Sequence, residues 1–357
     1  MLTADQGSAV KSAATNVKPG FELDATNACK GVALLLLLWH HLFYKHPEYG
    51  VWVYQSALFA KVCVAIFVLL SGYGFSRSVS AAPAGVAHFY RTRLVPLYMN
   101  YWFVALIFVT IGVCAVGVSL QGAYNGQPYL KFLVQMTGLH RYVYPEYGYN
   151  ATWWYMSVII PLTLLFPLLH PLMKGHGAKV LTVLLLLLLI KRPVVPVLNE
   201  WLFPFALGIY MAQRETISLI AAYLQRLGPT RFAVLFLGLA FVMLFRTYSP
   251  VLSGTRIDWL FAVLIIVLTY EVGRLSRLLQ RSLAYLGGHL FNIFLFHTFV
   301  YAYFWRDFIY ASGHPAAIFV TLLLVCLAVS EVLERIKQAI GFHVAVRRLR
   351  GRPATES

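Results

Sequence analysis

Long apolar stretches recur along the whole chain, and they constrain its fold more than any other feature. About 20 apolar residues cross the hydrocarbon core of a bilayer as a helix. Backbone polar groups cannot stay unpaired in lipid, so each stretch is expected to be helical. Of the 357 residues, 60% are apolar and only 12% are charged. We therefore predict an integral membrane protein, all-α in class, folded as a polytopic helix bundle.

The stretches predict about ten transmembrane helices. They lie near 29–45, 57–76, 97–120, 152–172, 179–198, 201–213, 231–247, 257–272, 284–304 and 316–333. A charged and proline-containing break at 191–196 ends the fifth, and the sixth is short, so these two could be kinked, re-entrant or merged. We predict a tail over 1–28, a transmembrane domain over 29–334 and a basic tail over 335–357.

The basic residues predict the orientation of the bundle. With the amino terminus in the cytoplasm, more than twice as many Lys and Arg residues fall on the cytoplasmic side as on the other. The positive-inside rule therefore predicts ten spans with both termini cytoplasmic. A net charge of +16 then needs no nucleic-acid partner, because the tail 335–357 is expected to lie along the anionic leaflet as a membrane-lipid contact. The tyrosine-rich loop 121–151 is expected outside, as an interfacial anchor or a carbohydrate face.

The first predicted span carries ionisable residues, which are costly in lipid and mark functional candidates. Lys30 opens it, and His40 and His41 follow the run of leucines. At about 100° and 1.5 Å per residue, Lys30 and His41 share one face and lie about 16 Å apart along the axis. His40 points about 80° away, so the two histidines are not expected to share one role.

A cation at the cytoplasmic mouth and a deeper imidazole suit a donor with a phosphate head and a reactive group on a long arm, such as acyl-coenzyme A. The imidazole could accept a proton from a sugar hydroxyl, or could take the acyl group itself. The alternative is that Lys30 reaches to the lipid headgroups and the histidines sit near an interface.

Two further motifs lie at the cytoplasmic ends of the second and third spans. Ser71 and Tyr73 belong to a Ser-Gly-Tyr-Gly segment, whose small residues allow helices to approach closely. Arg91 and Arg93 precede Pro96. Their guanidinium groups suit phosphate, although positive-inside anchoring also explains either one.

Polar and aromatic residues mark two other spans. Trp153 and Trp154 begin the fourth span and are interpreted as an outward aromatic belt. Asn292 and His297 lie deep in the ninth span and are expected to face the bundle. His297 is either a reactant or a hydrogen-bonded packing partner.

Together these motifs resemble the membrane-bound acyltransferase family 3, the multi-span O-acyltransferases that include bacterial exopolysaccharide and O-antigen acetyltransferases. The resemblance runs from Asp24 to about residue 334. Its motifs are Lys30, ten residues and His41; Phe67-Val-Leu-Leu-Ser-Gly-Tyr73; Arg91-Thr-Arg93-Leu-Val-Pro96; and Phe294-Leu-Phe-His297. Lys30 stands where Arg is common in the family, and Phe294 stands where Tyr is usual.

The resemblance implies an O-acyltransferase of the bacterial inner membrane that uses acetyl-coenzyme A and acts on a saccharide hydroxyl, as lipid-linked glycan or exopolysaccharide. It implies His41 as the essential histidine, with His40 as the secondary candidate. Donor binding is assigned to Lys30, Arg91 and Arg93, and substrate or structural support to Ser71, Tyr73, Asn292 and His297. No metal is predicted, since His40, His41 and His297 lack nearby acidic or thiol partners of suitable spacing.

Other classes of protein remain as alternatives. A transporter or flippase of a saccharide-type substrate would also bury such residues, usually with paired broken helices. O-acyltransferases of a different membrane fold and a non-catalytic sensor are the remaining possibilities.

Overall fold

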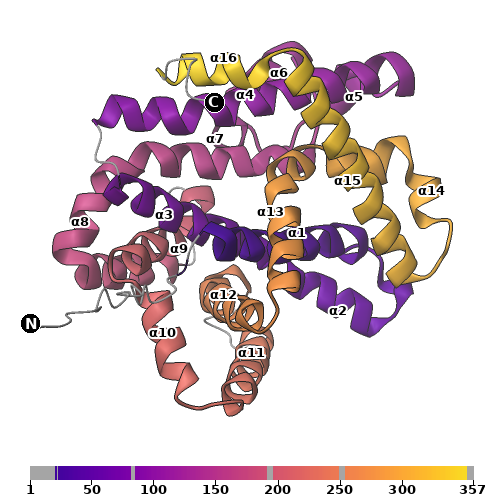
Figure 1. Cartoon of the computed structure of the whole chain (residues 1–357). Helices are drawn as coiled ribbons and strands as arrows, with labels where there is room; N and C mark the ends of the chain where they lie inside the picture. Colours follow the sequence, from indigo (N-terminus) through magenta and orange to yellow (C-terminus); the bar gives the residue numbers. More distant parts are fainter. Residues whose placement is uncertain (1–20, 22, 82–84, 191–195, 249–253, 352–357) are drawn as a thin grey trace, which may run out of the picture.

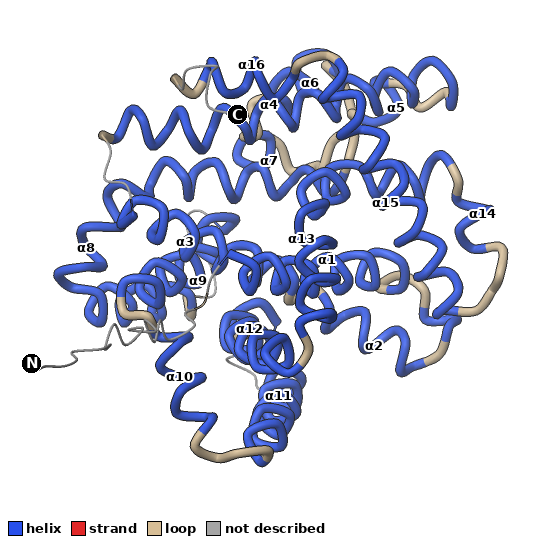
Figure 2. The backbone as a smooth tube through the Cα atoms, viewed as in Figure 1, coloured by secondary structure: helices blue, strands red, loops and turns tan. Residues whose placement is uncertain are grey.

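The chain is a helical bundle, as predicted. The computed structural model describes residues 21, 23–81, 85–190, 196–248 and 254–351. Figure 2 shows helices joined by loops and turns, and the described residues contain no strand. The all-α class is therefore confirmed.

The elements have the following bounds (Figure 1). The α-helices are α1 (Leu23–Phe43), α2 (Val51–Ala60), α3 (Cys63–Ala81), α4 (Val86–Ile111), α5 (Leu120–Ala123), α6 (Pro128–Met136), α7 (His140–Val143), α8 (Met156–Leu188), α9 (Pro196–Gln213), α10 (Thr216–Gln225), α11 (Thr230–Tyr248), α12 (Asp258–Leu275), α13 (Arg277–Thr298), α14 (Arg306–Tyr310), α15 (Pro315–Ala339) and α16 (Phe342–Leu349). Shorter 3₁₀ and π segments are η1 (Pro47–Tyr49), η2 (Gly112–Val116), η3 (Ala151–Tyr155), η4 (Gly254–Arg256) and η5 (Phe299–Phe304).

Six helical segments among the described residues are long and apolar enough to cross a membrane. They are Val51–Ala81, Val86–Val116, Ala151–Leu188, Thr230–Tyr248, Arg277–Phe304 and Pro315–Ala339. The protein is thus a multi-pass membrane protein, and the predicted count of ten is not confirmed. Within Ala151–Leu188 a kink at His176, where the backbone is non-helical, separates the stretch expected at 152–172 from the stretch expected to begin at 179. The charged part of the predicted break, 191–195, lies outside the described residues.

Helices α1 and α13 cross through two glycines. A Cβ atom on Gly31 would lie 2.0 Å from the carbonyl oxygen of Leu283, and one on Gly287 would lie 2.0 Å from that of Asn27. Each glycine therefore contacts the residue four positions before the other glycine, which is the symmetry of a parallel pair. Such backbone contact requires residues without side chains, and it is a common way to associate helices in lipid.

Helices α3 and α9 cross in the same manner. A Cβ atom on Gly72 would lie 2.2 Å from the carbonyl oxygen of Phe205, and one on Gly208 would lie 2.0 Å from that of Leu69. The close approach predicted for the Ser-Gly-Tyr-Gly segment is confirmed at Gly72. Gly74, two residues later, has no atom within 4 Å of its ideal Cβ position.

Buried ion pairs join α11 to α12 at both ends. Arg231 lies 2.9 Å from the buried carboxylate of Glu271, and Arg246 lies 2.7 Å from that of Asp258. In the sequence these two arginines counted only among the basic residues from which the orientation was predicted. A charged side chain is tolerated inside a membrane bundle where an opposite charge compensates it. These two ion pairs therefore determine which faces of α11 and α12 pack against each other.

A polar network joins α4, α13 and α15. The ammonium group of Lys337, which is 2% exposed, donates to Oδ1 of Asn292 at 2.8 Å and to Oε1 of Glu334 at 2.7 Å. Asn292 donates to Glu334 at 2.7 Å and receives a bond from Asn100 of α4 at 3.1 Å. Lys337, assigned from sequence to the basic tail, thus lies within the last turns of α15 and inside the bundle.

The Lys337→Met variant is expected to lower the free energy of unfolding by about 3 kcal/mol, because it removes the buried cation that compensates the Glu334 carboxylate and leaves Asn100 as the remaining donor to the Asn292 carbonyl. A Lys337→Met, Glu334→Gln double variant should recover a large part of this loss, since it removes the uncompensated charge. Chemical unfolding of both variants in the same detergent measures the difference. Equal stability of the single variant and the wild type would contradict a structural role for the network.

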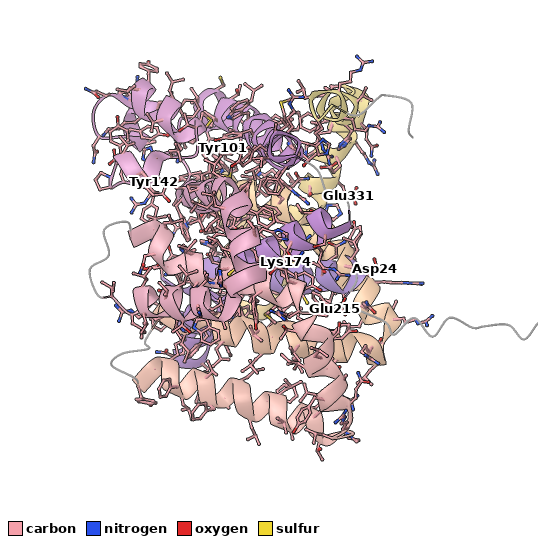
Figure 3. All side chains as sticks on the ribbon, turned by 90° about the vertical axis from the view of Figure 1, so that its left-hand side faces the viewer. Asp24, Tyr101, Tyr142, Lys174, Glu215 and Glu331 are labelled. Carbon is pink, nitrogen blue, oxygen red and sulfur yellow. The ribbon has the colours of Figure 1, made fainter. Side chains whose placement is uncertain are left out.

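The segment between α4 and α8 forms an ordered cap. Gln135 is buried and binds the hydroxyl of Tyr124, the backbone N–H of Tyr149 and the carbonyl of Tyr147. Tyr124 and Tyr149 are buried, so the prediction that they are interfacial is wrong for these two. In Figure 3, Tyr142 of this cap lies on the opposite side of the molecule from Asp24 and Glu331.

An ion pair also fixes the cap from within. The ammonium group of Lys131 lies 2.6 Å from Oε1 of Glu146. Hydrogen bonding to this ammonium group lowers the pKa of the Glu146 carboxyl below its ordinary value. Because the folded-state pKa is depressed, the pair's contribution to the cap is present near neutral pH and is lost as the pH falls through that pKa.

Candidate functional site

Helices α1 and α13 bring His41 and His297 next to each other. Each histidine stands ten residues after a crossing glycine, Gly31 in α1 and Gly287 in α13. Because the helices run parallel, both chains advance about 15 Å in the same direction from the crossing. The two imidazole centroids are 4.9 Å apart, with ring planes inclined by 56°. Two residues far apart in the sequence thus form one imidazole pair.

His297 is held in one tautomer. Its side chain is fully buried, and Nδ1 lies 2.9 Å from the carbonyl oxygen of Ile293 and 3.1 Å from that of Phe294. Carbonyl oxygens only accept hydrogen bonds, so we assign the proton to Nδ1. Nε2 then carries a lone pair, and this buried atom has no hydrogen-bond partner among the described residues. An acceptor is therefore available beside His41.

Aromatic rings surround the pair. The His41 ring is half-buried, and its centroid lies 5.9 Å from that of Tyr44 and 6.3 Å from that of Tyr301. Tyr301 also stacks on His297 at 6.1 Å. These rings give the site an apolar wall with hydroxyl groups at its edge.

His40 faces a different part of the bundle. Its Nδ1 lies 2.7 Å from the carbonyl oxygen of Ala57 in α2, and its ring stacks on Tyr44 at 4.6 Å. Lys61 and Arg246, at the ends of α2 and α11, are within electrostatic range of its ring. The helical arithmetic that separated His40 from His41 is therefore confirmed: His41 faces α13 and His40 faces α2.

Hydrogen bonds from residues at η3 fix the turn of α13 that carries His297. After His297 the helix changes to the wider π segment η5, and the N–H of Phe299 bonds the carbonyl of Phe296 rather than that of Leu295. The Leu295 carbonyl accepts instead from Trp153 Nε1 at 2.8 Å and Asn150 Nδ2 at 3.3 Å. π segments of this kind are frequent at functional sites.

Trp153 was predicted to belong to an outward aromatic belt, and this prediction is wrong. Its side chain is buried and bound to the helix that carries His297. Asn150, fully buried beside it, was missed altogether. Its position as the amino-terminal cap of η3 was a signal in the sequence, because Asn is a preferred capping residue.

Two of the three predicted donor-site cations interact electrostatically with each other. The ammonium of Lys30 donates to Asn27 Oδ1 at 3.1 Å and is within electrostatic range of Arg93. Arg93 donates to Ser78 and stacks on Phe75 at 4.9 Å. Within the described part of the chain, neither cation is in an ion pair with a carboxylate.

The third predicted cation, Arg91, is exposed and lies apart from this pair. Two residues along a helix turn the side chain by about 200°, so Arg91 and Arg93 point to nearly opposite sides of α4. The structure thus groups Lys30 with Arg93 and leaves Arg91 at the surface.

The residues predicted as support are distributed over the bundle. Ser71 donates to the carbonyl of Phe67 at 2.7 Å within α3. Tyr73 is buried against Phe21, with ring centroids 5.2 Å apart. Asn292 belongs to the Lys337 network. Of these predicted support residues, only His297 adjoins His41.

A comparison with protein families agrees with this architecture. The acyltransferase domain of family 3 matches residues 23–335, which is nearly the whole helical bundle. The chain matches no curated protein and no solved structure. The family match covers both helices of the imidazole pair and the two grouped cations. The chain therefore belongs to the membrane-bound acyltransferase family 3, and it is a multi-pass membrane enzyme that transfers an acyl group to a hydroxyl.

Proposed function

We propose that the protein transfers an acyl group, most simply acetyl, from acyl-coenzyme A to a saccharide hydroxyl, on a lipid-linked glycan or an exopolysaccharide. The observation that carries this proposal is the His41–His297 pair. Along α1, His41 lies about 16 Å from Lys30, whose ammonium group is a candidate phosphate ligand. A base and an anion site at that separation fit a thioester on a long arm with phosphates at its other end. The family match favours acyl transfer over the transport of a saccharide.

His41 serves as the general base in this proposal. Its imidazole takes the proton of the acceptor hydroxyl while the oxygen attacks the thioester carbonyl. The carbon–sulfur bond then breaks, and the thiolate of coenzyme A takes the proton from the imidazolium of His41. His297 is a positioning residue: its Nε2 lone pair can accept the N–H of His41 and leave the other nitrogen of His41 free for the hydroxyl proton.

Acyl transfer through His41 itself is the competing mechanism. In that case an imidazole nitrogen attacks the thioester and an acyl-histidine forms before the acceptor arrives. Incubation with radiolabelled acetyl-coenzyme A without acceptor distinguishes the two. Label on His41 would overturn the general-base mechanism, whereas unlabelled protein that still transfers acetyl when acceptor is added supports it.

The acceptor is proposed to approach from the end of α1 that carries the histidines. His40, Lys61 and Arg246 lie there, and Tyr149 of the tyrosine-rich cap packs on Phe299, two residues after His297, with ring centroids 6.0 Å apart. Aromatic faces and hydrogen-bonding groups of this kind suit a saccharide. With cytoplasmic termini and an inner-membrane location, donor and acceptor would then enter from opposite sides of the membrane.

The proposal is tested by release of free coenzyme A from acetyl-coenzyme A. The purified protein in nanodiscs is supplied with a panel of lipid-linked and soluble saccharides. Release that depends on one class of acceptor would support the proposal and identify the acceptor. A folded wild-type protein that neither binds nor consumes acetyl-coenzyme A would overturn it.

The Lys30→Ala variant is expected to raise the KM for acetyl-coenzyme A about tenfold with little change in kcat, because a lost charge–phosphate contact weakens donor binding by roughly 1.5 kcal/mol. Lys179, in α8, offers a matched control. Lys179→Ala removes an exposed ammonium group and should leave the KM unchanged. A wild-type KM in the Lys30 variant would contradict its assignment to the donor site.

A further inference from the structure

Helix α16 places a third cation beside the pair formed by Lys30 and Arg93. Arg350 directly follows α16 and is within electrostatic range of Arg93. It is half-buried, whereas Arg348 of the same helix is exposed. Sequence reasoning assigned this region to a tail on the lipid surface and gave Arg350 no individual role.

The packing of α16 explains why Arg350 reaches this position. Figure 1 shows α16 lying along α4. At the start of α16 the ring of Phe342 lies 5.3 Å from that of Phe103, and both rings face the Lys337 ammonium at 5.6 Å. Helix α16 is further held by His343, whose Nε2 lies 3.2 Å from Oε2 of Glu334.

The register of the two helices follows from these contacts. Arg93 precedes Phe103 by ten residues, and Arg350 follows Phe342 by eight. These distances correspond to about 15 Å and 12 Å of helix. Helix α16 runs antiparallel to α4 (Figure 1), so from the Phe103–Phe342 contact both guanidinium groups arrive at about the same level. The electrostatic interaction between Arg93 and Arg350 agrees with that direction.

Like charges repel, so a fold gathers cations at one place when an anion is to be bound there. Lys30 and Arg93 both lack a carboxylate partner among the described residues. Lys30 lies along α1 from the imidazole pair and interacts electrostatically with Arg93, and Arg93 interacts in turn with Arg350. Coenzyme A carries its phosphates in a matching order, with the pyrophosphate at the end of the pantetheine arm and the 3′-phosphate on the ribose beyond it.

We infer that Arg350 binds the ribose 3′-phosphate of the acyl-coenzyme A donor, so that α16 completes the donor site formed by Lys30 and Arg93. The inference rests on the proposed function. The guanidinium plane of Arg350 suits a terminal phosphate, which offers oxygens for two parallel hydrogen bonds. The network around Lys337 and Glu334 then also contributes to donor binding, because it fixes the position of α16, the helix that Arg350 follows.

Binding of free coenzyme A and of 3′-dephospho-coenzyme A to the full-length protein tests the inference. Titration calorimetry in nanodiscs of phosphatidylcholine alone removes anionic headgroups, the other source of phosphate that could occupy Arg350. Arg350→Gln is expected to weaken binding of coenzyme A about tenfold and to leave binding of the dephospho form unchanged. Arg348→Gln removes an exposed charge from the same helix and should leave both affinities at the wild-type values.

Each contrary result is distinct. Equal affinity of wild type and Arg350→Gln for coenzyme A would overturn the inference and leave the proposed function intact. Equal losses of coenzyme A affinity in the Arg348 and Arg350 variants would show that Arg350 acts only through the overall positive charge of α16, and would overturn the inference. An effect of Arg350→Gln seen only when anionic lipid is added would show that Arg350 binds lipid headgroups, and would overturn it as well. Failure of the wild-type protein to bind either nucleotide would overturn the proposed function.

Discussion

The His41→Ala variant is expected to release coenzyme A about 10³-fold more slowly than the wild type in the presence of acceptor, while its affinity for coenzyme A stays unchanged. General-base catalysis by a positioned imidazole contributes roughly 10²- to 10⁴-fold, which sets the size of the loss. Binding is spared because the cations lie about 16 Å away along α1. Discontinuous assays of coenzyme A release measure the turnover rate, and titration calorimetry on the same preparation measures the affinity for coenzyme A.

Two further histidine variants test whether the loss of turnover is specific to His41. His88→Ala removes an exposed imidazole near the amino-terminal end of α4 and should retain wild-type turnover. His297→Ala removes the buried imidazole beside His41 and should lower kcat less than His41→Ala does, with a shifted pH profile of kcat because His41 loses the acceptor proposed to orient its N–H. Wild-type turnover of His41→Ala would show that another group performs the chemistry.

The Gly31→Ala variant is expected to lose about 3 kcal/mol of unfolding free energy and most of its activity. The new Cβ would lie 2.0 Å from the carbonyl oxygen of Leu283, so the backbones of α1 and α13 must separate. Inserting one carbon into a packed contact costs roughly 1–3 kcal/mol, and here the neighbour is backbone that cannot rotate away. The separation would also widen the 4.9 Å imidazole pair.

Gly288→Ala is the matched control for this prediction. Gly288 follows the crossing glycine of α13 directly, and its ideal Cβ position has no atom within 4 Å. Alanine there should leave activity unchanged and raise helix stability by up to about 1 kcal/mol, because alanine has the higher helix propensity. Thermal unfolding in one detergent compares the variants. Equal stability of Gly31→Ala and wild type would disprove a direct backbone contact between α1 and α13.

The sequence predicted part of the candidate site because that part lies on one helix. The distance from Lys30 to His41 and the separate direction of His40 follow from helix geometry alone. The close approach at Gly72 followed from residue size. The proximity of His41 to His297 could not be predicted in this way, since it depends on the relative shift of α1 and α13, which the symmetric contacts of Gly31 and Gly287 set.

The errors have a common physical cause. Trp153 was assigned to the membrane interface and Lys337 to a surface tail because each residue type is common there. Both are buried, since each donates hydrogen bonds to an acceptor on another helix, the Leu295 carbonyl for Trp153 and Asn292 for Lys337. Local composition contains no information about such partners.

The sequence by itself determined that this protein is a helical membrane protein, that it resembles an acyltransferase family, and which face of its first span carries a cation and an imidazole. Those properties depend on hydrophobicity and on the geometry of a single helix. Only the tertiary structure decided that His297 faces His41, that Arg93 rather than Arg91 joins Lys30, and that Arg350 approaches them. These depend on contacts between helices distant in sequence, where backbone meets backbone at glycines and buried charges find their partners.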